Sequence, residues 1–471
     1  MRLRLGPAAI AALALLAPTA GLASELEAYS STQLNVQSQW RNGASTTVVP
    51  LYEFLSLTGR EVAIPGGQLY FQVDGWGAAN LGSNPWWNGF TNSGAFSGDL
   101  NLAWVQGRFF ENQFRVTIGR QTVGYGNSRM LQLDGLSLQG VIAKMVTLDA
   151  YVGVPTTQRF TAYGNLYSAN PTIGDFAVGA RAGFAWTTWL NAGVSAAFAW
   201  DTWPATSEWK PSREDLAVDV RFSPVSWVTL LGYLDWSLFA SNYFSGFGGQ
   251  IADANLSLIF PVNPYLQFTG EYTYSVPALA LPYNSILWVF TDTAHQYAGA
   301  TARVGLELFK IKVPLDIEVG YRRIFESWSG LATSAGAGDR YVLKATWRAT
   351  KTATLGAEGA RLYLPGASVP VAPGVSESLA NEGYWQARAF GTMKAYGVTG
   401  TLDFQGYWFD QPVNAVKQSI IGSATLGYDV GGGFAVVGAL QAGTTPFYAS
   451  YMNGLVKLTY NATYRSREVY E

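Results

Sequence analysis

The stretch that decides the fold runs from Asn101 to Val154 and reads NLAWVQGRFF ENQ FRVTIGRQTV GYGNSRMLQ LDGLSLQGVIA KM VTLDAYVGV. Apolar residues alternate with polar or small residues in runs of about ten, which is the pattern of a half-buried β-strand. The connections alternate in length too: short near Glu111, longer near Gly124 and short again near Lys144. Short turns at one end and long loops at the other are typical of a transmembrane β-barrel, so this stretch predicts four strands of one.

The same alternation continues outward to both ends of the chain and gives about 22 strand candidates. Short turns recur at pairs such as Ser223-Pro224 and Gly431-Gly432, while longer Gly/Pro/Ser-rich loops separate the hairpins, for example Ser275–Thr293, Glu326–Asp339 and Pro365–Asn381. The sequence therefore predicts an all-β fold, a single antiparallel transmembrane β-barrel of about 18–22 strands in even number. Its short turns and both termini are expected in the periplasm, and its long loops outside the cell.

Composition favours this barrel over a soluble β-protein. Charged residues make up 13% of the chain, about half the share usual in soluble domains, and aromatic residues make up 14%. Few charges and many aromatic residues suit strands with one face in lipid and aromatic side chains at both interfaces. The net charge of −2 gives no basic field for nucleic acid, and the absence of cysteine excludes disulfides and thiolate chemistry.

The N-terminus predicts the compartment. Met1–Arg4 is basic, Leu5–Ala17 is apolar but too short to span a bilayer, and Gly21-Leu22-Ala23 is a small-x-small cleavage signal. We therefore expect residues 1–23 to be a signal peptide and residues 24–471 to be the barrel, located in the outer membrane of a Gram-negative bacterium. No later apolar run is long enough for a transmembrane helix.

Strand phase separates a lipid face from a lumen face. On 398–409, Leu402, Phe404 and Trp408 are predicted to face lipid, and Asp403 and Gln405 to face inward. A charge on the lipid face near the bilayer centre costs roughly 2–4 kcal/mol, so charged residues fix the phase of the strands that carry them.

The inward-facing charges fall into two sectors of the predicted lumen. The acidic sector consists of Asp215, Asp219, Asp235 and Glu271, and the basic sector consists of Arg303, Arg322, Arg340, Lys344, Arg348 and Arg388. One interpretation is that these charges cross-link the wall or hydrate a polar lumen. The other is a field across the lumen with a basic ladder, Arg340, Lys344 and Arg348, that guides an anionic sugar polymer, because alternate residues of one strand point the same way.

A short motif carries a family resemblance. Gly119-Arg120-Gln121, followed by Tyr125-Gly126, Arg129 and Asp134-Gly135-Leu136, resembles the outer-membrane porin-like families that include alginate-export-type barrels. The resemblance implies passive passage across the outer membrane. Some members of these families serve polysaccharide secretion beside a periplasmic export lipoprotein, and others admit small solutes. From the residues alone, the glycines of the motif are expected to shape the barrel wall.

Catalysis finds little support in the sequence. His295 is the single histidine, so a site with several histidine ligands is excluded, and no spacing places a serine and an orienting group beside it. No Gly-rich loop precedes a helix with a phosphate-binding lysine. We therefore predict a protein that is not an enzyme, with no catalytic residue, no metal site and no cofactor.

The predicted function is an outer-membrane porin-like channel, a passive conduit associated with export of a cell-surface polysaccharide. The alternatives are a general diffusion porin for small hydrophilic solutes and a closed structural or assembly barrel. The expected partners are outer-membrane lipid, a periplasmic polysaccharide-export protein, and saccharides or small hydrophilic solutes. A barrel of 22 strands is wide, and the sequence leaves no room for an N-terminal plug, so loops such as Asn80–Gly98 or Pro155–Gly174 are expected to fold inward. Substrate, direction of transport and oligomeric state stay open.

Overall fold

The computed structural model describes residues 25–41, 44–82, 96–124, 131–156, 176–202, 209–239, 250–275, 295–325, 327–329, 332–335, 337–364, 368–372, 375–378, 383–413, 415–446 and 448–465. The predicted signal peptide lies outside these residues, as do most of the predicted long loops. The described elements are β1 (Glu25–Arg41), β2 (Ala44–Val48), β3 (Pro50–Ile64), β4 (Gly67–Asn80), β5 (Phe96–Phe109), β6 (Phe114–Val123), β7 (Leu131–Ile142), β8 (Val146–Pro155), β9 (Phe176–Trp186), β10 (Leu190–Thr202), β11 (Trp209–Val225), β12 (Val228–Phe239), β13 (Gln250–Asn263), β14 (Leu266–Ser275), β15 (His295–Gly305), η3 (Leu306–Phe309), β16 (Leu315–Phe325), β17 (Ser327–Ser329), β18 (Ala332–Ala335), β19 (Gly338–Trp347), β20 (Ala353–Tyr363), β21 (Ser368–Ala372), β22 (Val375–Ser378), β23 (Tyr384–Ala395), β24 (Val398–Val413), β25 (Val416–Gly431), β26 (Phe434–Gly443) and β27 (Ser450–Arg465).

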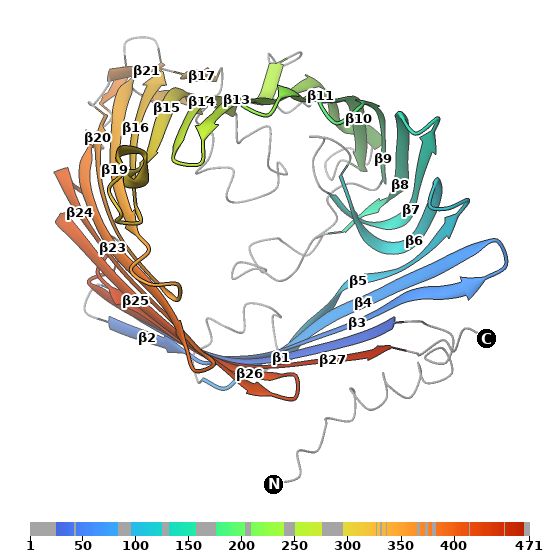
Figure 1. Ribbon diagram of the computed structural model, residues 1–471, viewed down its shortest axis with the longest axis horizontal. Coiled ribbons are helices and arrows are strands. Elements are labelled where there is room, and N and C mark those ends of the chain that lie inside the picture. The colour runs from blue at the N-terminus through green and yellow to red at the C-terminus, as the bar shows by residue number, and fades with distance from the viewer. Residues whose placement is uncertain are drawn as a thin grey trace, which may run out of the picture.

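The strands form one closed antiparallel barrel (Figure 1). Each barrel strand pairs with the next one along the chain, and β1 closes the ring by pairing with β27 from Glu25 opposite Arg465 to Trp40 opposite Ser450. Both β2 and β3 pair with β1 and together form one barrel strand, interrupted at Val49-Pro50. Proline has no N–H to donate to the ladder, which accounts for the break. The barrel therefore has 22 strands, at the upper end of the predicted range.

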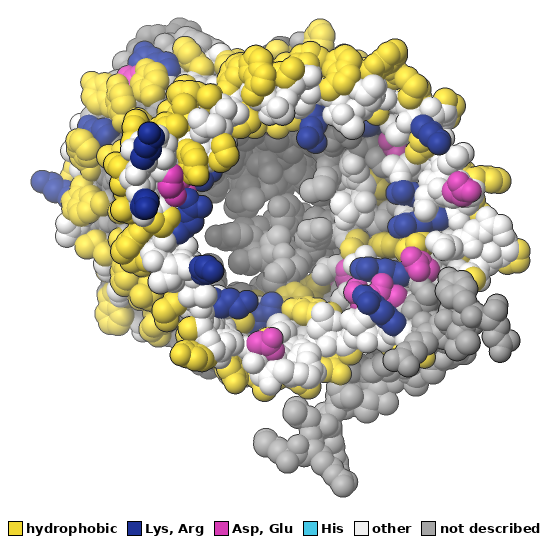
Figure 2. Space-filling model, in the orientation of Figure 1, with side chains coloured by type: hydrophobic (Ala, Val, Ile, Leu, Met, Phe, Trp, Pro, Cys, Tyr) yellow, Lys and Arg dark blue, Asp and Glu magenta, His cyan; other side chains and the backbone are white. Residues whose placement is uncertain are grey.

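The pleat of each strand gives the barrel two chemically different faces. Val319, Leu343, Leu402 and Phe404 lie on the outer face and are each more than half exposed. Asp403, between two of them, lies on the inner face. Figure 2 shows hydrophobic side chains around the outer perimeter and Lys and Arg side chains on the wall of the central opening. Because closure leaves no sheet edge and the outer face is hydrophobic, the barrel is a transmembrane barrel of the Gram-negative outer membrane.

The two ends of the barrel differ as the sequence predicts. One end carries tight turns, such as Tyr396-Gly397, where both residues have positive φ values of 51° and 78°. Two consecutive positive φ values are typical of the hairpin turns that match the right-handed twist of paired strands. The other end carries the long connections, whose described parts include two small hairpins, β17–β18 and β21–β22. We refer below to these as the turn end and the loop end.

The strand boundaries on either side of Lys310 differ from the predicted ones. The alternation predicts a strand over residues 297–309 and the next from Val313, but β15 ends at Gly305 and β16 begins at Leu315. The 3₁₀ helix η3 replaces the end of the first strand, and Lys310 after it has a left-handed φ of 62°. Pro314 has no N–H for the ladder, so the second strand starts after it. Among the described residues, no helix is long and apolar enough to cross a membrane.

Candidate functional site

The residues predicted to line the lumen lie on the inner face of seven strands. Asp215 and Asp219 are on β11, Asp235 on β12, Glu271 on β14, Arg303 on β15, Arg322 on β16, Arg340 and Lys344 on β19, and Arg388 on β23. Arg348 follows the last residue of β19 at the turn end. Apart from β15, each of these strands carries exposed large hydrophobic side chains at alternate positions, as β16 does at Val319 and Tyr321.

One ion pair joins the predicted acidic sector to the predicted basic sector. Arg322 binds Glu271, which lies two strands away on β14. Gly299 stands between them on β15, directly opposite both residues. A Cβ on Gly299 would lie 2.7 Å from Cγ of Arg322. The missing side chain of Gly299 therefore creates a trough in the inner wall, and the Arg322 side chain passes through this trough.

A second pair of the same kind joins β9 and β11, three strands before β14 in the ring. Arg181 on β9 donates two hydrogen bonds to Asp219 on β11, at 3.1 Å from Nε and 2.7 Å from Nη2. The guanidinium lies over Gly193 of β10, where a Cβ would approach Nη2 to 2.3 Å. Arg181 is not among the residues predicted to line the lumen, although its phase within FAVGARAGFAW places it on the inner face.

Three more basic residues of the predicted set are also paired. Arg303 binds Asp316 at 2.9 Å, Arg388 binds Asp403, and Arg348 lies 3.5 Å from Glu307 and 3.7 Å from Asp316. Asp215 and Asp235 are almost fully buried in the wall, with 1% and 3% of their surface exposed. Most of the predicted lumen charges are therefore part of a cross-linked wall.

Arg340 and Lys344 differ from the other basic residues because neither forms an ion pair with any residue that the structure describes. Arg340 lies opposite Arg322, and its Nε atom is buried without a hydrogen-bond partner. Lys344 lies opposite Glu318 and Glu358, and its Nζ atom is 6.0 Å from the centre of the Phe390 ring. Two inward-facing cations on one strand are thus left available to a solute, and Arg348, the third member of the predicted ladder, is not.

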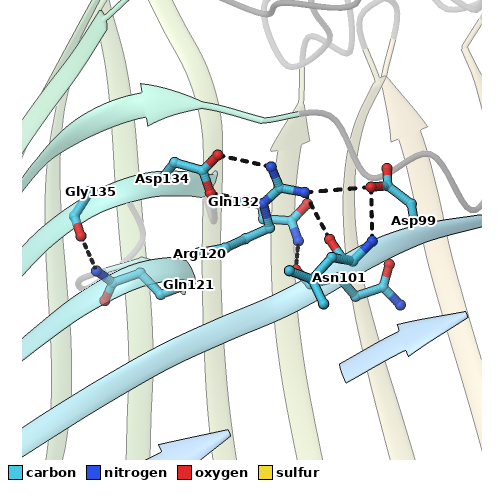
Figure 3. A network of polar contacts seen from close by, with 8 residues as sticks. Asp99, Asn101, Arg120, Gln121, Gln132, Asp134 and Gly135 are labelled. Carbon is cyan, nitrogen blue, oxygen red and sulfur yellow. Dashed lines mark hydrogen bonds and ion pairs between the residues drawn. The ribbon is translucent and has the colours of Figure 1, made fainter. Parts of the chain in front are cut away.

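The motif that carries the family resemblance builds wall structure (Figure 3). Arg120 lies on the outer face, where its Nε and Nη2 atoms each donate to Asp134 at 2.8 Å and its Nη1 atom donates to the Leu100 carbonyl at 2.8 Å. Gln121 lies on the inner face, accepts a hydrogen bond from Ser137 at 2.6 Å and donates to the Gly135 carbonyl. These contacts join β5, β6 and β7, so the motif holds three strands together. Tyr125, Gly126 and Arg129 lie outside the described residues.

Two glycines of this motif are required by close backbone approach, as the sequence predicts. Gly119 has a φ of +120°, and a Cβ on it would lie 2.2 Å from the Ala103 carbonyl oxygen. A Cβ on Gly135 would lie 2.1 Å from the Val152 carbonyl oxygen.

An apolar cluster on the inner face was not foreseen from the sequence. Val123, Leu133, Tyr151 and Ala177, on β6 to β9, are each at most 3% exposed and pack together. In the sequence, Leu133 is one of several apolar residues in an alternating strand. Alternation separates the two faces of a strand but does not show which parts of the inner face are packed. This part of the inner wall is therefore apolar rather than hydrated.

Among the described residues, no group of three or more His, Asp or Glu side chains is placed to hold a metal ion. The backbone of His295 begins β15, and its side chain lies outside the described part of the chain.

Comparison with known proteins gives matches among solved structures alone. No protein-family model matches the chain, and no curated protein matches it. The chain is similar to Acinetobacter baumannii OccAB4, with a TM-score of 0.45 and 10% identity over 94% of this chain and 99% of that one. It is similar to the P pilus usher (PapC) translocation pore, with a TM-score of 0.46 and 9% identity over 93% and 99%. It is also similar to Pseudomonas aeruginosa OpdK with vanillate, with a TM-score of 0.43 and 11% identity over 93% and 98%.

Proposed function

We propose that the chain is a porin-like channel through which hydrophilic solutes cross the outer membrane passively. The observation that carries this proposal is the closed 22-stranded wall with a hydrophobic outer face and a charged inner face. A barrel sealed by an apolar interior would not need a polar inner face. A polar inner face is typical of a barrel whose lumen is filled with water. The mechanism is diffusion along this wall, with no covalent step and no energy source.

The finer proposal concerns the solute. We infer that Arg340 and Lys344 attract anionic saccharides, because both cations face inward and lack an ion-pair partner among the described residues. A polymer with a regular array of carboxylates would exchange its counterions for such cations as it passes. Export of an anionic cell-surface polysaccharide, with a periplasmic export protein as partner, is the specific form of this proposal. General diffusion of small hydrophilic solutes is the alternative.

A conductance experiment distinguishes these functions. The refolded protein is placed in a planar bilayer, and single-channel current is recorded with oligogalacturonate or with neutral malto-oligosaccharide added. For the anionic conduit we expect steady current that oligogalacturonate blocks and malto-oligosaccharide leaves unchanged. In the double variant R340Q/K344Q the block should weaken at least 10-fold, since a hydrogen bond to a charged group contributes about 1.5–3 kcal/mol.

The variant R348Q is the matched control, because Arg348 is a neighbouring cation already paired with Glu307 and Asp316. It should retain most of the block. Open current that is indifferent to both sugars and to all three substitutions supports a general diffusion porin. A correctly folded sample without any current rejects both pore functions and favours a closed structural barrel.

A further inference from the structure

A small polar niche opens in the inner wall of β9 to β13, away from the Arg340–Lys344 pair. It has a cavity volume of about 280 Å³ and is lined by Arg181, Asn191, Asp219, Arg221, Tyr233 and Asn255. Small-molecule sites usually enclose roughly 300–1,000 Å³, so a niche of this size suits a ligand no larger than a monosaccharide.

One side of the niche is a neutral, prebuilt ion pair. Both guanidinium–carboxylate bonds between Arg181 and Asp219 are made, and the two side chains are 13% and 21% exposed. Gly193 lies beneath the pair, and because it has no side chain the Arg181 guanidinium can lie flat against the wall. This pair fixes the shape of the niche and contributes no net charge to it.

The other side of the niche carries side chains with unused hydrogen-bonding capacity. Arg221 and Asn191 lie directly opposite each other on β11 and β10. Within the described part of the chain, neither side chain makes a hydrogen bond or an ion pair. Arg221 therefore gives the niche a net charge of one positive unit, and a guanidinium fork matches the geometry of a carboxylate.

Polar groups beside Arg221 provide further hydrogen-bonding contacts. Tyr233 and Asn255 lie opposite each other on β12 and β13, in the same inner row as Asp219. The Asn255 amide donates to Thr273 at 2.9 Å and accepts from Ser257 at 3.2 Å, which holds it in a fixed orientation. A phenol, an oriented amide and a second amide around one free guanidinium are groups that recognise hydroxyls near a carboxylate.

We propose that this niche is a binding site for a small carboxylated sugar, with its carboxylate on Arg221 and its hydroxyls facing Asn191, Tyr233 and Asn255. The proposal rests on the proposed channel function, because a solute reaches the inner wall through the lumen. It adds a second binding site for anions, built from β9 to β13 and therefore from different strands than Arg340 and Lys344 on β19.

Binding of glucuronate and of glucose to the detergent-solubilised full chain, measured by saturation-transfer NMR and calorimetry, tests the niche. The two sugars match in size and differ in the carboxylate. We expect glucuronate to bind and glucose to bind at least 10-fold more weakly, and R221Q to weaken glucuronate binding at least 10-fold. The control is K457Q, which removes another inward-facing cation on β27, opposite Gln33, and should leave binding unchanged.

The outcomes separate this proposal from the channel proposal, because binding in detergent does not require current. Equal binding of the two sugars, equal loss in R221Q and K457Q, or no glucuronate binding to the wild type overturns the niche, whatever the conductance. Glucuronate binding that depends on Arg221 in a barrel without current supports the niche and rejects the channel.

Discussion

Arg322 on β16 binds Glu271 on β14 by passing over Gly299, the residue that stands between them on β15. Adjacent strands lie about 4.8 Å apart, so the two residues span roughly 10 Å of wall, a distance that an arginine and a glutamate bridge only if nothing rises between them. Arg181 and Asp219 repeat this arrangement over Gly193. In each case a glycine allows a charge pair to join three strands.

Filling the trough at Gly299 should break the first of these bridges. We expect Gly299→Val to lower the free energy of unfolding by about 1–3 kcal/mol, because the new side chain overlaps Arg322 and crowds the Tyr321 carbonyl. Urea titration of the barrel in lipid vesicles measures the change. Gly270→Val on β14 is the control, since a Cβ there meets no atom within 4 Å. Equal losses in both variants would show that the trough has no special role.

Removing one carboxylate from the inner wall should change ion selectivity. Asp219→Asn removes the carboxylate that Arg181 binds and adds one net positive charge to the inner wall. One unit charge at about 10 Å changes the energy of a passing ion by about 0.4 kcal/mol in water. Because this energy favours anions and disfavours cations equally, the anion-to-cation permeability ratio, read from the reversal potential in a KCl gradient, should rise about 4-fold.

The control for this selectivity change is Asp410→Asn. Asp410 makes an equivalent pair with Arg361, with contacts of 2.6 and 2.8 Å, but Arg361 is on the outer face beside Tyr341 and Trp385. Its removal should leave the ratio unchanged. A shift of equal size in both variants would mean that distant charge, rather than the inner wall, sets selectivity.

A side chain at Gly119 should be far more costly than one at a glycine in an open turn. Gly119→Ala places a Cβ 2.2 Å from a backbone oxygen at a φ of +120°, and we expect a loss of about 2–4 kcal/mol in the free energy of unfolding. Gly431→Ala has a positive φ of +87° but meets no atom, so it should cost only about 1 kcal/mol. Parallel urea titrations compare them, and a smaller loss at Gly119 would contradict the close approach of β5 and β6.

The apolar cluster on the inner face should behave like a protein core. Leu133 is fully buried, so Leu133→Ala should cost about 2–5 kcal/mol through the cavity that it leaves. Leu426→Ala, at a position that is 60% exposed on the outer face, leaves no cavity because lipid fills the space, and it should cost clearly less. The same titration distinguishes the two. If Leu133→Ala were as mild as Leu426→Ala, the inner face there would be solvated rather than packed.

The strand order and strand phase were accessible from the sequence because charges and apolar residues alternate with a period of two. On β24, Asp403 between Leu402 and Phe404 fixes which face is inward, and the structure agrees. The pairing of charges was not accessible. Arg322 and Glu271 are 51 residues apart and skip a strand, so their meeting depends on the register of β14, β15 and β16 together.

The limits of sequence reasoning are clearest for the basic ladder. Arg340, Lys344 and Arg348 share one strand phase, and the sequence treats them alike. The structure separates them because η3 brings Glu307 to Arg348, whereas nothing acidic within 4.0 Å reaches Arg340 or Lys344 among the described residues. The 3₁₀ helix η3 lies where the sequence predicts the end of a strand. The sequence therefore does not show that Arg348 is paired while Arg340 and Lys344 are not.

The seam between β1 and β27 makes assembly of this wall an all-or-none event. Until the segment at Glu25–Arg41 meets the one at Ser450–Arg465, the growing sheet carries two long unpaired borders, and each of them exposes backbone groups that no lipid tail can satisfy. β27 must therefore pair with β1, more than 400 residues earlier in the sequence, before the backbone groups of both strands are satisfied in a bilayer. A cell that makes this protein has to shield those borders during transit, and a substitution that weakens the seam would act on the yield of inserted barrels rather than on their transport.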